Sequence, residues 1–487
     1  MRSNSTSIRV GLCAGVHPNM PGDDRGVYKR IIGSMEKLQE EMGFELVTLK
    51  GPVESEADGH KAREFFDGHA VDLTLIFNAS LPYGRIILPL ARVKSCLGLW
   101  AVPEPTRAGV LQLNSFCGLN MLGSIIAHYL NEYNIPFKWF YDYPETELFR
   151  ERFAVTLRAI QAIKALRLSR IGQVGNLADG FENMYTDERV LEKKFGTYLQ
   201  TRHTVEDIVA RAKSLDGKRV KEEIDRMLGE GEWVKQRVTT EAMEKSARVS
   251  LALLDFAEEH DYDALAVSCW SKFQEVYGIA VCGALSRLNE MGIVAPCEAD
   301  IAGAVNMIIF NAMNGGRAAF TDLVALDDED KSVNFWHCGV TCASWANEKG
   351  IRWDAHFNIG SYEGDTWVGD GVVADLVLRP TRITVCTMDN AFDNLFIMGG
   401  DVMPDKEGFY GGSGWVNNLQ ICGKDITIRD LINTICVGRV NHHYPIAAGE
   451  LTAELMEFAN WKGLKVLDRI PYKPYLQLPP GVQPSGL

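Results

Sequence analysis

Long apolar runs are missing from this 487-residue chain, and none reaches the roughly 18 residues that a membrane-spanning helix needs. The short apolar run of residues 10–16 lacks the h-region and the cleavage site of a secretory signal peptide. Basic residues are also in the minority, since 50 Lys and Arg face 64 Asp and Glu, a net charge of −14. No basic stripe marks a nucleic-acid surface. These absences predict a cytoplasmic protein without a membrane or nucleic-acid partner.

A disulfide framework and the common nucleotide motifs are absent as well. The 11 cysteines are odd in number, and most lie inside apolar stretches, which is typical of buried thiols in a reducing compartment. No Gly-x-Gly-x-x-Gly follows the first predicted strand, and the chain has no Walker A loop. There is no Gly-x-Ser-x-Gly elbow, and we interpret residues 412–414 as a turn. The sequence therefore gives little support to dinucleotide, P-loop or serine-hydrolase chemistry.

The first third of the sequence alternates short apolar segments with amphipathic ones. Near-continuous apolar strands that alternate with helices predict a parallel, doubly wound sheet. A second alternating block follows a long helix predicted at residues 148–166. We therefore expect one Rossmann-like α/β domain at residues 1–170 and another at residues 171–350. The strands predicted in the first third are residues 8–13, 45–49, 71–77, 96–102 and 136–141, and its helices are residues 28–41, 62–69 and 119–132.

The composition changes near residue 350, where Gly, Asp, Thr and Val become frequent and turn signals follow at short intervals. Strands predicted at residues 373–379 and 381–386 fit an antiparallel, barrel-like β domain over residues 351–487. A last helix at residues 451–462 precedes an extended, proline-rich tail. The predicted fold class is α/β, with two Rossmann-like doubly wound domains followed by a C-terminal antiparallel β-barrel-like domain.

Two carboxylates stand at the ends of apolar segments. Glu298 ends the strand predicted at residues 294–298, where an acid costs free energy unless it is paired or liganded. Open α/β sheets place their sites at such strand ends. Asp300 is better placed to cap the following helix, which leaves Glu298 as the candidate functional acid. Asp322 ends a second apolar segment in the same way, whereas we interpret the acidic residues 327–330 as a solvated loop.

Histidine is scarce, with ten in the chain. His442 and His443 are adjacent, and a metal site would use one of them, although a surface pair at a strand edge fits the pattern as well. His337 ends a strand predicted at residues 333–336 and could reach a metal or a substrate. Its neighbours Cys338 and Cys342 lack the spacing of a structural zinc site. Two carboxylates with one histidine suit Mn²⁺ or Mg²⁺ better than zinc, and such an ion polarises a carbonyl while a carboxylate moves a proton.

These residues resemble the L-fucose isomerase family, with the L-arabinose isomerases as more distant relatives. Glu298 is followed by the small-residue segment 302–305, and Asp322 comes 24 positions after Glu298, like the two acids of that family. The segment from His442 to Gly449 is similar to its C-terminal motif, and the alignment makes His443 the ligand and His442 a substrate contact. Weaker likeness lies in residues 24–27 and in residues 97–109.

The resemblance implies a metal-dependent aldose–ketose isomerase that works through a cis-enediol. Glu298, Asp322 and His443 would hold Mn²⁺, or alternatively Mg²⁺ or Co²⁺, and both acids would also move the proton. Because the family closes its sites with a neighbouring subunit, we expect a homo-oligomer, a trimer or a hexamer. The resemblance implies substrate contacts by Arg25, Trp100, Arg107, Asn176, Trp270, Gln274 and His442, to which the strand end adds His337. Plain loop roles stay open for Asn176, Trp270 and Gln274.

The differences from the family concern the sugar. His442 stands where fucose isomerases carry Asn, and residues 78–83 replace their aromatic substrate segment. Relatives of this length act on other aldoses, among them sulfonated sugars such as sulfoquinovose. An anionic substrate would need a basic side chain, for which Arg25, Arg30, Arg85 and Arg107 are available. The alternatives are a sugar-binding or sensor protein without catalysis and a metal-dependent sugar epimerase or lyase. Whether Cys297 matters beside Glu298 is open.

Overall fold

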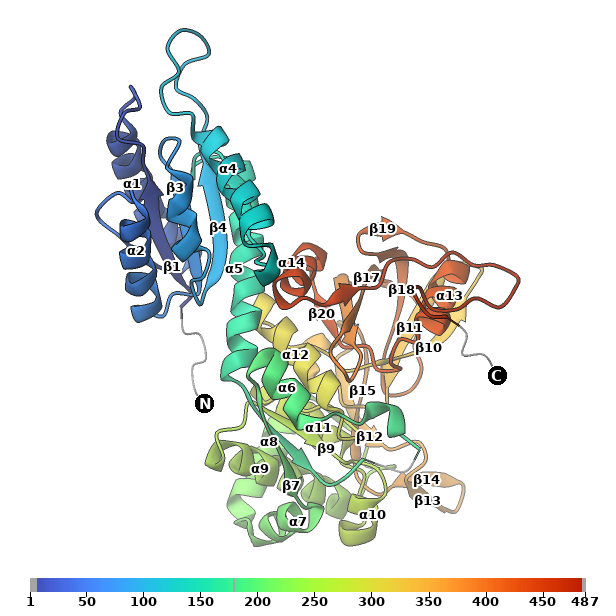
Figure 1. The fold of residues 1–487 in the computed structure, drawn as a ribbon. Helices are drawn as coiled ribbons and strands as arrows, with labels where there is room; N and C mark the ends of the chain where they lie inside the picture. Colours follow the sequence, from blue (N-terminus) through green and yellow to red (C-terminus); the bar gives the residue numbers. More distant parts are fainter. Residues whose placement is uncertain (1–6, 178–179, 484–487) are drawn as a thin grey trace. The chain divides into compact units, whose positions relative to one another are not determined.

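A computed structural model describes residues 7–177 and 180–483, which belong to two compact units divided between residues 164 and 165 (Figure 1). Each unit is described by itself below. Among the described residues, we find no helix whose length and hydropathy would let it cross a bilayer.

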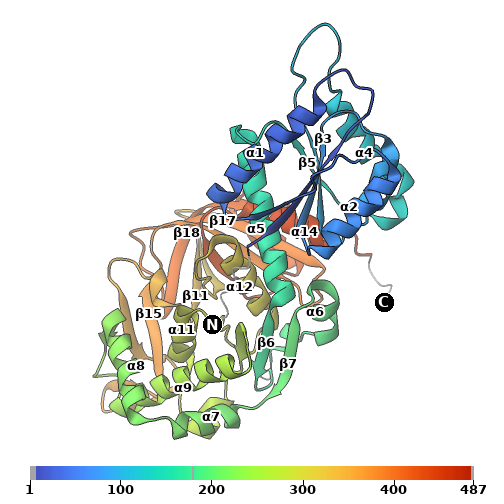
Figure 2. The ribbon, with the colours of Figure 1, turned by 90° about the vertical axis from the view of Figure 1, so that its left-hand side faces the viewer.

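The first unit is built on a five-stranded parallel sheet with the order β2-β1-β3-β4-β5. In Figure 2 the strands of this sheet, among them β3 and β5, lie between helices on either side. The strand order reverses at β1, so the chain winds outward in both directions. The strands are β1 (Arg9–Gly15), β2 (Glu45–Thr48), β3 (Leu73–Asn78), β4 (Cys96–Ala101) and β5 (Lys138–Tyr141). The five strands predicted in this region are confirmed.

Helices cover both faces of this sheet because its strands carry apolar side chains on both sides. One core contains side chains of α1 (Asp24–Met42) and of α5 (Glu147–Leu168). Only the part of α5 up to residue 164 belongs to this unit. The other core contains side chains of α2 (Glu56–Gly68), α3 (Ile87–Leu90) and α4 (Ser115–Tyr129). Along β1, Leu12 packs into the first core and Cys13 into the second, as the alternation of a strand requires.

The second unit begins with a small parallel sheet of the order β7-β6-β9. Its strands are β6 (Arg170–Val174), β7 (Tyr198–His203) and β9 (Ala264–Val267). The helices around it are α6 (Glu188–Phe195), α7 (Val205–Ser214), α8 (Gly217–Glu230), α9 (Thr240–Glu259), α10 (Lys272–Tyr277), α11 (Cys282–Met291) and α12 (Ile301–Asn314). Residues 276–291 do not form one helix, because Gly278 adopts a left-handed φ of +69° and ends α10 there, and α11 begins at Cys282.

The same unit contains an 11-stranded, mainly antiparallel sheet, whose main path is β20-β16-β17-β18-β15-β12-β8. It includes β8, β10 and β11, which precede residue 350, so it lies on both sides of the predicted boundary. The barrel and the boundary between second and third domains stay predictions. The strands are β8 (Gly231–Trp233), β10 (Asp322–Asp327), β11 (Ser332–His337), β12 (Ile351–Ala355), β15 (Val372–Val377), β16 (Arg382–Met388), β17 (Asn394–Val402), β18 (Gly412–Ile421), β19 (Lys424–Asp425), β20 (Ile446–Ala448) and β21 (Lys465–Val466). A hairpin of β13 (Gly360–Glu363) and β14 (Thr366–Gly369), with helices α13 (Ile428–Gly438) and α14 (Thr452–Lys462), completes the unit.

Phe153 tests the packing of the first unit. It is fully buried on α5, with its ring 5.4–6.0 Å from those of Phe44, Phe140 and Phe149. We expect Phe153→Ala to lower the free energy of unfolding by about 3–5 kcal/mol because it leaves a cavity. Urea unfolding followed by circular dichroism measures this loss. Phe116→Ala is the control, since Phe116 is 60% exposed on α4. Equal losses in both variants would contradict the packing described here.

Candidate functional site

Glu298 stands on a turn at the end of an extended segment beside β9. The N–H of Leu265 donates to the carbonyl of Val294 at 2.8 Å, and the N–H of Ala299 donates to the carbonyl of Val267 at 3.0 Å. Glu298 and Ala299 both have left-handed φ angles, +60° and +56°, which residues other than glycine rarely adopt. Such backbone strain persists where the surroundings impose it, and it gathers at functional sites.

Backbone pairing holds Asp322 next to His443. Residues 319–322 run antiparallel to residues 443–446, with Ala319 and Ile446 exchanging hydrogen bonds of 2.9 and 2.8 Å. The pairing sets Nε2 of His443 3.6 Å from Oδ1 of Asp322 and 3.2 Å from Oε2 of Glu298. Glu298 and Asp322 therefore both lie beside His443, the third residue that the resemblance implied as a ligand, although 145 positions separate Glu298 from His443.

His337 joins this group from the end of β11. Strands β10 and β11 form an antiparallel pair in which Asp322 lies opposite Trp336, so the next residue, His337, reaches the same end of the hairpin. One ligand atom each of Asp322, His337 and His443 lies within 4.8 Å of the others. The sequence left open whether His337 reaches a metal or a substrate, and the structure places it among the candidate ligands. Pairing the predicted strand at 333–336 with the segment after Asp322 could have indicated this.

The atoms that meet here are buried and have no hydrogen-bond partner among the described residues. They are Oε2 of Glu298, Oδ1 of Asp322, Nε2 of His337 and Nε2 of His443. Most buried polar atoms are paired, so four unpaired ones in one place need an explanation. Two carboxylate oxygens and two imidazole nitrogens are a suitable donor set for a divalent first-row metal ion. The residues present therefore fit a metal.

Asp300 orients His443 from behind. Its Oδ2 accepts a hydrogen bond from Nδ1 of His443 at 2.9 Å, and both residues are buried. This bond keeps the proton on Nδ1 and leaves the lone pair of Nε2 for a metal. The capping role expected for Asp300 is wrong, because it stands at the N-cap position of α12 without a capping hydrogen bond. Gly303 leaves room for the carboxylate, since a Cβ there would come within 2.6 Å of Oδ2 of Asp300.

The charges of the site balance one another. Burial disfavours the protonated form of His443, but the carboxylates of Asp300 and Glu298 outweigh it and raise its pKa to about 9. Burial also opposes a charged His337, yet nearby Cys338 and Asp322 raise its pKa to about 10. Burial acts to raise the pKa of Glu298, but His443 and His337 bring it below its usual value. Burial raises the pKa of Asp322. Without a metal, the two histidines thus hold protons that neutralise the acids.

Three other residues that were predicted to contact the substrate belong to this unit: His442, Asn176 and Trp270. His442 is half-buried, with its ring 4.0 Å from that of His443 and its Nδ1 3.0 Å from the amide nitrogen of Asn183. Asn176 lines a pocket of about 690 Å³ that also includes Ala299, the residue after Glu298. It lines a second pocket of about 460 Å³ as well, together with Trp270.

Gln274 has a different role from the predicted one. Its side-chain amide donates to the carbonyls of Cys269 and Ile279, both at 3.0 Å, and it lines neither of these two pockets. It therefore closes the loop around α10.

Three predicted contacts belong to the first unit. Trp100 is a core residue there, with no exposed surface and with its Nε1 donating to the carbonyl of Asp142 at 2.8 Å. The first unit thus offers no surface of Trp100 to a sugar. Arg25 and Arg107 are exposed, and Arg25 forms an ion pair with Glu54.

The acidic residues 327–330, in the second unit, are largely exposed, as expected.

Curated relatives cover most of the chain. A sulfoquinovose isomerase of Alkalicoccus urumqiensis is 33% identical over 379 residues, which are 76% of this chain and 80% of that protein. The chain belongs to the sulfoquinovose isomerase family. Sulfoquinovose isomerases of Priestia aryabhattai and Priestia megaterium are 26% identical over 408 residues, 82% of this chain and 85% of theirs. No protein-family model matches the chain.

Membership of the sulfoquinovose isomerase family makes this chain an aldose–ketose isomerase, an intramolecular oxidoreductase of carbohydrate metabolism. The predicted enzyme class is confirmed. The relatives support a sugar isomerase family, but not L-fucose isomerases in particular. A solved structure of an ABC transporter solute-binding protein from Agrobacterium vitis, bound with α-D-tagatopyranose, is 10% identical over 64% of this chain and 90% of its own. The TM-score of this pair is 0.18.

Asp300 gives a test of the metal site. In Asp300→Asn, an uncharged amide replaces the carboxylate that holds the Nδ1 proton of His443. We expect binding of Mn²⁺ to weaken by about 10–100-fold, as for other partners of metal-ligating histidines. Titration of the metal-free protein, with free Mn²⁺ followed by electron paramagnetic resonance, gives the dissociation constant. Asp328→Asn, on the exposed acidic loop, is the matched control. Unchanged affinity in Asp300→Asn would count against this site.

The raised pKa values of His337 and His443, about 10 and about 9, predict that metal uptake releases protons. Below these values the metal-free rings are charged, and ligation needs a neutral Nε2. Affinity for Mn²⁺ should therefore rise with pH, by about tenfold per pH unit for each proton displaced. Calorimetry in buffers of different ionisation enthalpy measures the released protons. A dissociation constant that stays constant between about pH 6 and about pH 8 would refute the proton balance.

Proposed function

We propose that this chain is a metal-dependent isomerase of sulfoquinovose, a sulfonated aldose, which it converts to the ketose through a cis-enediol. One observation carries the metal-dependent mechanism: buried ligand atoms of Glu298, Asp322 and His337 lie around His443, and these atoms have no hydrogen-bond partner among the described residues. The substrate rests on the name shared by the curated relatives. The resemblance to L-fucose isomerases supports the same reaction.

The proposed metal is Mn²⁺, with Mg²⁺ or Co²⁺ as alternatives. Glu298, Asp322 and His443 would hold it, and His337 would be a fourth ligand. Two imidazole nitrogens favour Mn²⁺ over Mg²⁺, which prefers oxygen ligands. When bound, such an ion polarises a carbonyl and makes nearby hydroxyl groups more acidic.

The two carboxylates do the proton transfer in this proposal. Glu298 and Asp322 both lie within 4 Å of Nε2 of His443, so a sugar held at this point is close to both. One carboxylate takes the proton from C2, and the same or the other one returns a proton to C1. Asp300 keeps His443 in place throughout. The pocket of about 690 Å³ that Asn176 and Ala299 line has the size of a small-molecule site, and in this proposal it would accommodate the rest of the sugar.

The proposal also includes the oligomeric state and the cellular location of the enzyme. We propose a homo-oligomer, a trimer or hexamer, in which Arg25 and Arg107 of a neighbouring subunit contact the anionic substrate, as the resemblance implies. A cytoplasmic location is part of the proposal. It is supported by the cysteines, none of which forms a disulfide in the described part of the chain.

A direct assay tests this function. Protein treated with a chelator is given back Mn²⁺ and then sulfoquinovose, L-fucose or D-arabinose in D₂O, and proton NMR follows the ketose and the deuterium at C1. Glu298→Gln should lower turnover by about 10²–10⁴-fold, because it removes an acid–base group, and should also weaken Mn²⁺ binding. Glu329→Gln, on the exposed acidic loop, should behave as the unsubstituted enzyme.

Three outcomes would contradict the proposal. Near-normal activity of Glu298→Gln with full metal content would remove Glu298 from the mechanism. A product epimerised at one carbon, without ketose, would make the chain an epimerase. No turnover of any of these sugars, with no metal bound, would favour the sugar-binding alternative.

A further inference from the structure

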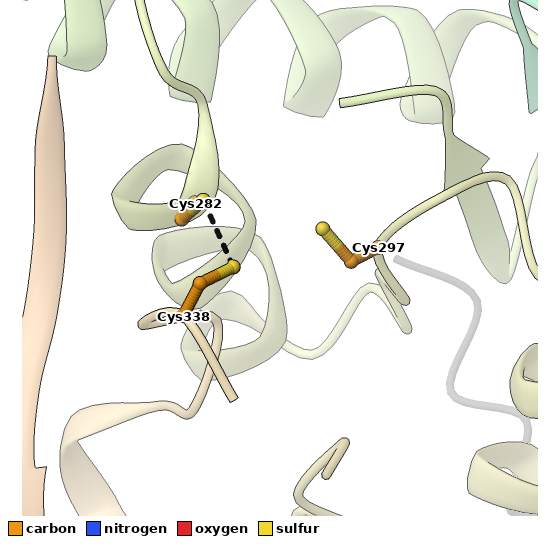
Figure 3. A group of neighbouring side chains, drawn as sticks. All are labelled: Cys282, Cys297 and Cys338. Carbon is orange, nitrogen blue, oxygen red and sulfur yellow. Dashed lines mark hydrogen bonds between the residues drawn. The ribbon is translucent and has the colours of Figure 1, made fainter. Parts of the chain in front are cut away.

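Three thiols converge beside the carboxylate–histidine cluster (Figure 3). Cys282 is the first residue of α11, Cys297 immediately precedes Glu298, and Cys338 immediately follows His337. Cys282 and Cys297 are buried, and Cys338 is half-buried. In Figure 3, Cys282 and Cys338 point toward each other, and Cys297 faces the pair from the other side. No step of the proposed isomerisation uses these side chains.

The distances between the sulfur atoms match a shared ion. The Sγ atoms of Cys282 and Cys338 are 3.3 Å apart, and all three Sγ atoms lie within 4.8 Å of one another. Thiolates that bind zinc at about 2.3 Å in a tetrahedron are separated by about 3.8 Å, which lies inside this range. A disulfide would need about 2.0 Å and would use two thiols, leaving the third without a role.

We propose that Cys282, Cys297 and Cys338 form a binding site for one thiophilic cation, Zn²⁺ or Cu⁺. Binding forms three sulfur–metal bonds, each sulfur that still carries a proton releases it, and no atom changes its oxidation state. Thiolate sulfur selects such soft ions, whereas the oxygen and nitrogen atoms of the neighbouring cluster suit Mn²⁺. The thiol site does not depend on the proposed substrate or on the isomerase mechanism.

The two sites are covalently linked. The peptide bonds Cys297–Glu298 and His337–Cys338 each join one thiol to one candidate ligand of the harder metal. In addition, Nδ1 of His337 lies 3.2 Å from Sγ of Cys338. An ion held by the thiols therefore fixes the positions of Glu298 and His337, and we expect it to change the affinity of the neighbouring cluster for Mn²⁺.

Cys269 is a competing partner. Its Sγ lies 2.6 Å from that of Cys297, too close for both sulfurs to bind one ion with the spacing given above. Oxidation of this pair would remove Cys297 from the thiol site, so the test needs a thiol-free reductant. Cys269→Ser then separates the two possibilities, because it abolishes the pair and keeps all three proposed ligands.

The experiment uses the full chain with the exposed Cys117 and Cys436 replaced by Ser. Metal-free, reduced protein is titrated with Cd²⁺, whose bonds to thiolates absorb in the ultraviolet. We expect one equivalent to bind, and Zn²⁺ and Cu⁺, added in separate arms, to displace it. Cys282→Ser, Cys297→Ser and Cys338→Ser should each weaken this binding by about 10²-fold or more. Cys386→Ser, a buried thiol away from the cluster, is the matched control, and circular dichroism checks that each variant is folded.

Glu298→Gln distinguishes this proposal from the proposed function, since it should lose Mn²⁺ and activity but keep the cadmium absorbance. The proposal fails if no sulfur–cadmium band appears, or if the band persists in the folded variants of the three cysteines. It also fails if neither Zn²⁺ nor Cu⁺ displaces Cd²⁺. Finally, it fails if the protein keeps a Cys269–Cys297 disulfide under the reductant, seen as seven free thiols instead of the nine that remain of the 11 after Cys117 and Cys436 are replaced.

Discussion

The antiparallel pairing of residues 319–322 with residues 443–446 is the constraint on which the candidate site depends. It joins the start of β10 to the segment before β20 and sets Asp322 beside His443. Without it the two candidate ligands belong to chain segments more than a hundred residues apart. The hairpin of β10 and β11 then adds His337, and the turn after the segment beside β9 adds Glu298.

This arrangement of the candidate ligands costs free energy, through backbone strain and through buried polar atoms. Two consecutive left-handed residues, Glu298 and Ala299, hold the turn, and four polar atoms are buried without a hydrogen-bond partner in the described part of the chain. In the metal-free protein, proton uptake by His337 and His443 offsets the negative charge of the acids. A divalent ion would supply the same two positive charges and would bond to the same atoms. The site is thus organised for a cation before one binds, and Asp300 fixes the imidazole of His443 in advance.

Two different sets of donor atoms lie next to each other in this unit. One set consists of carboxylate oxygen and imidazole nitrogen, and the other of thiol sulfur. They are adjacent because Cys297 and Glu298, and likewise His337 and Cys338, are neighbours in the chain. Each pair of neighbours supplies one donor to each set, and Nδ1 of His337 lies 3.2 Å from Sγ of Cys338. The same turn and the same strand end therefore serve both.

The sequence by itself indicated the parallel strands of the first unit and marked Glu298 and Asp322 as candidate acids, because apolar periodicity and position at the end of an apolar segment are local properties. The choice of His443 over His442 as the candidate ligand came from the resemblance to the L-fucose isomerase family. Only the tertiary structure decided the roles of His337, Asp300, Gln274 and Trp100. Whether a polar side chain caps a helix, closes a loop or faces a metal depends on which distant segment packs against it. For Asp300 that segment is His443, and for His337 it is the strand that starts at Asp322. These partners are fixed by long-range strand pairing, which a single sequence does not display.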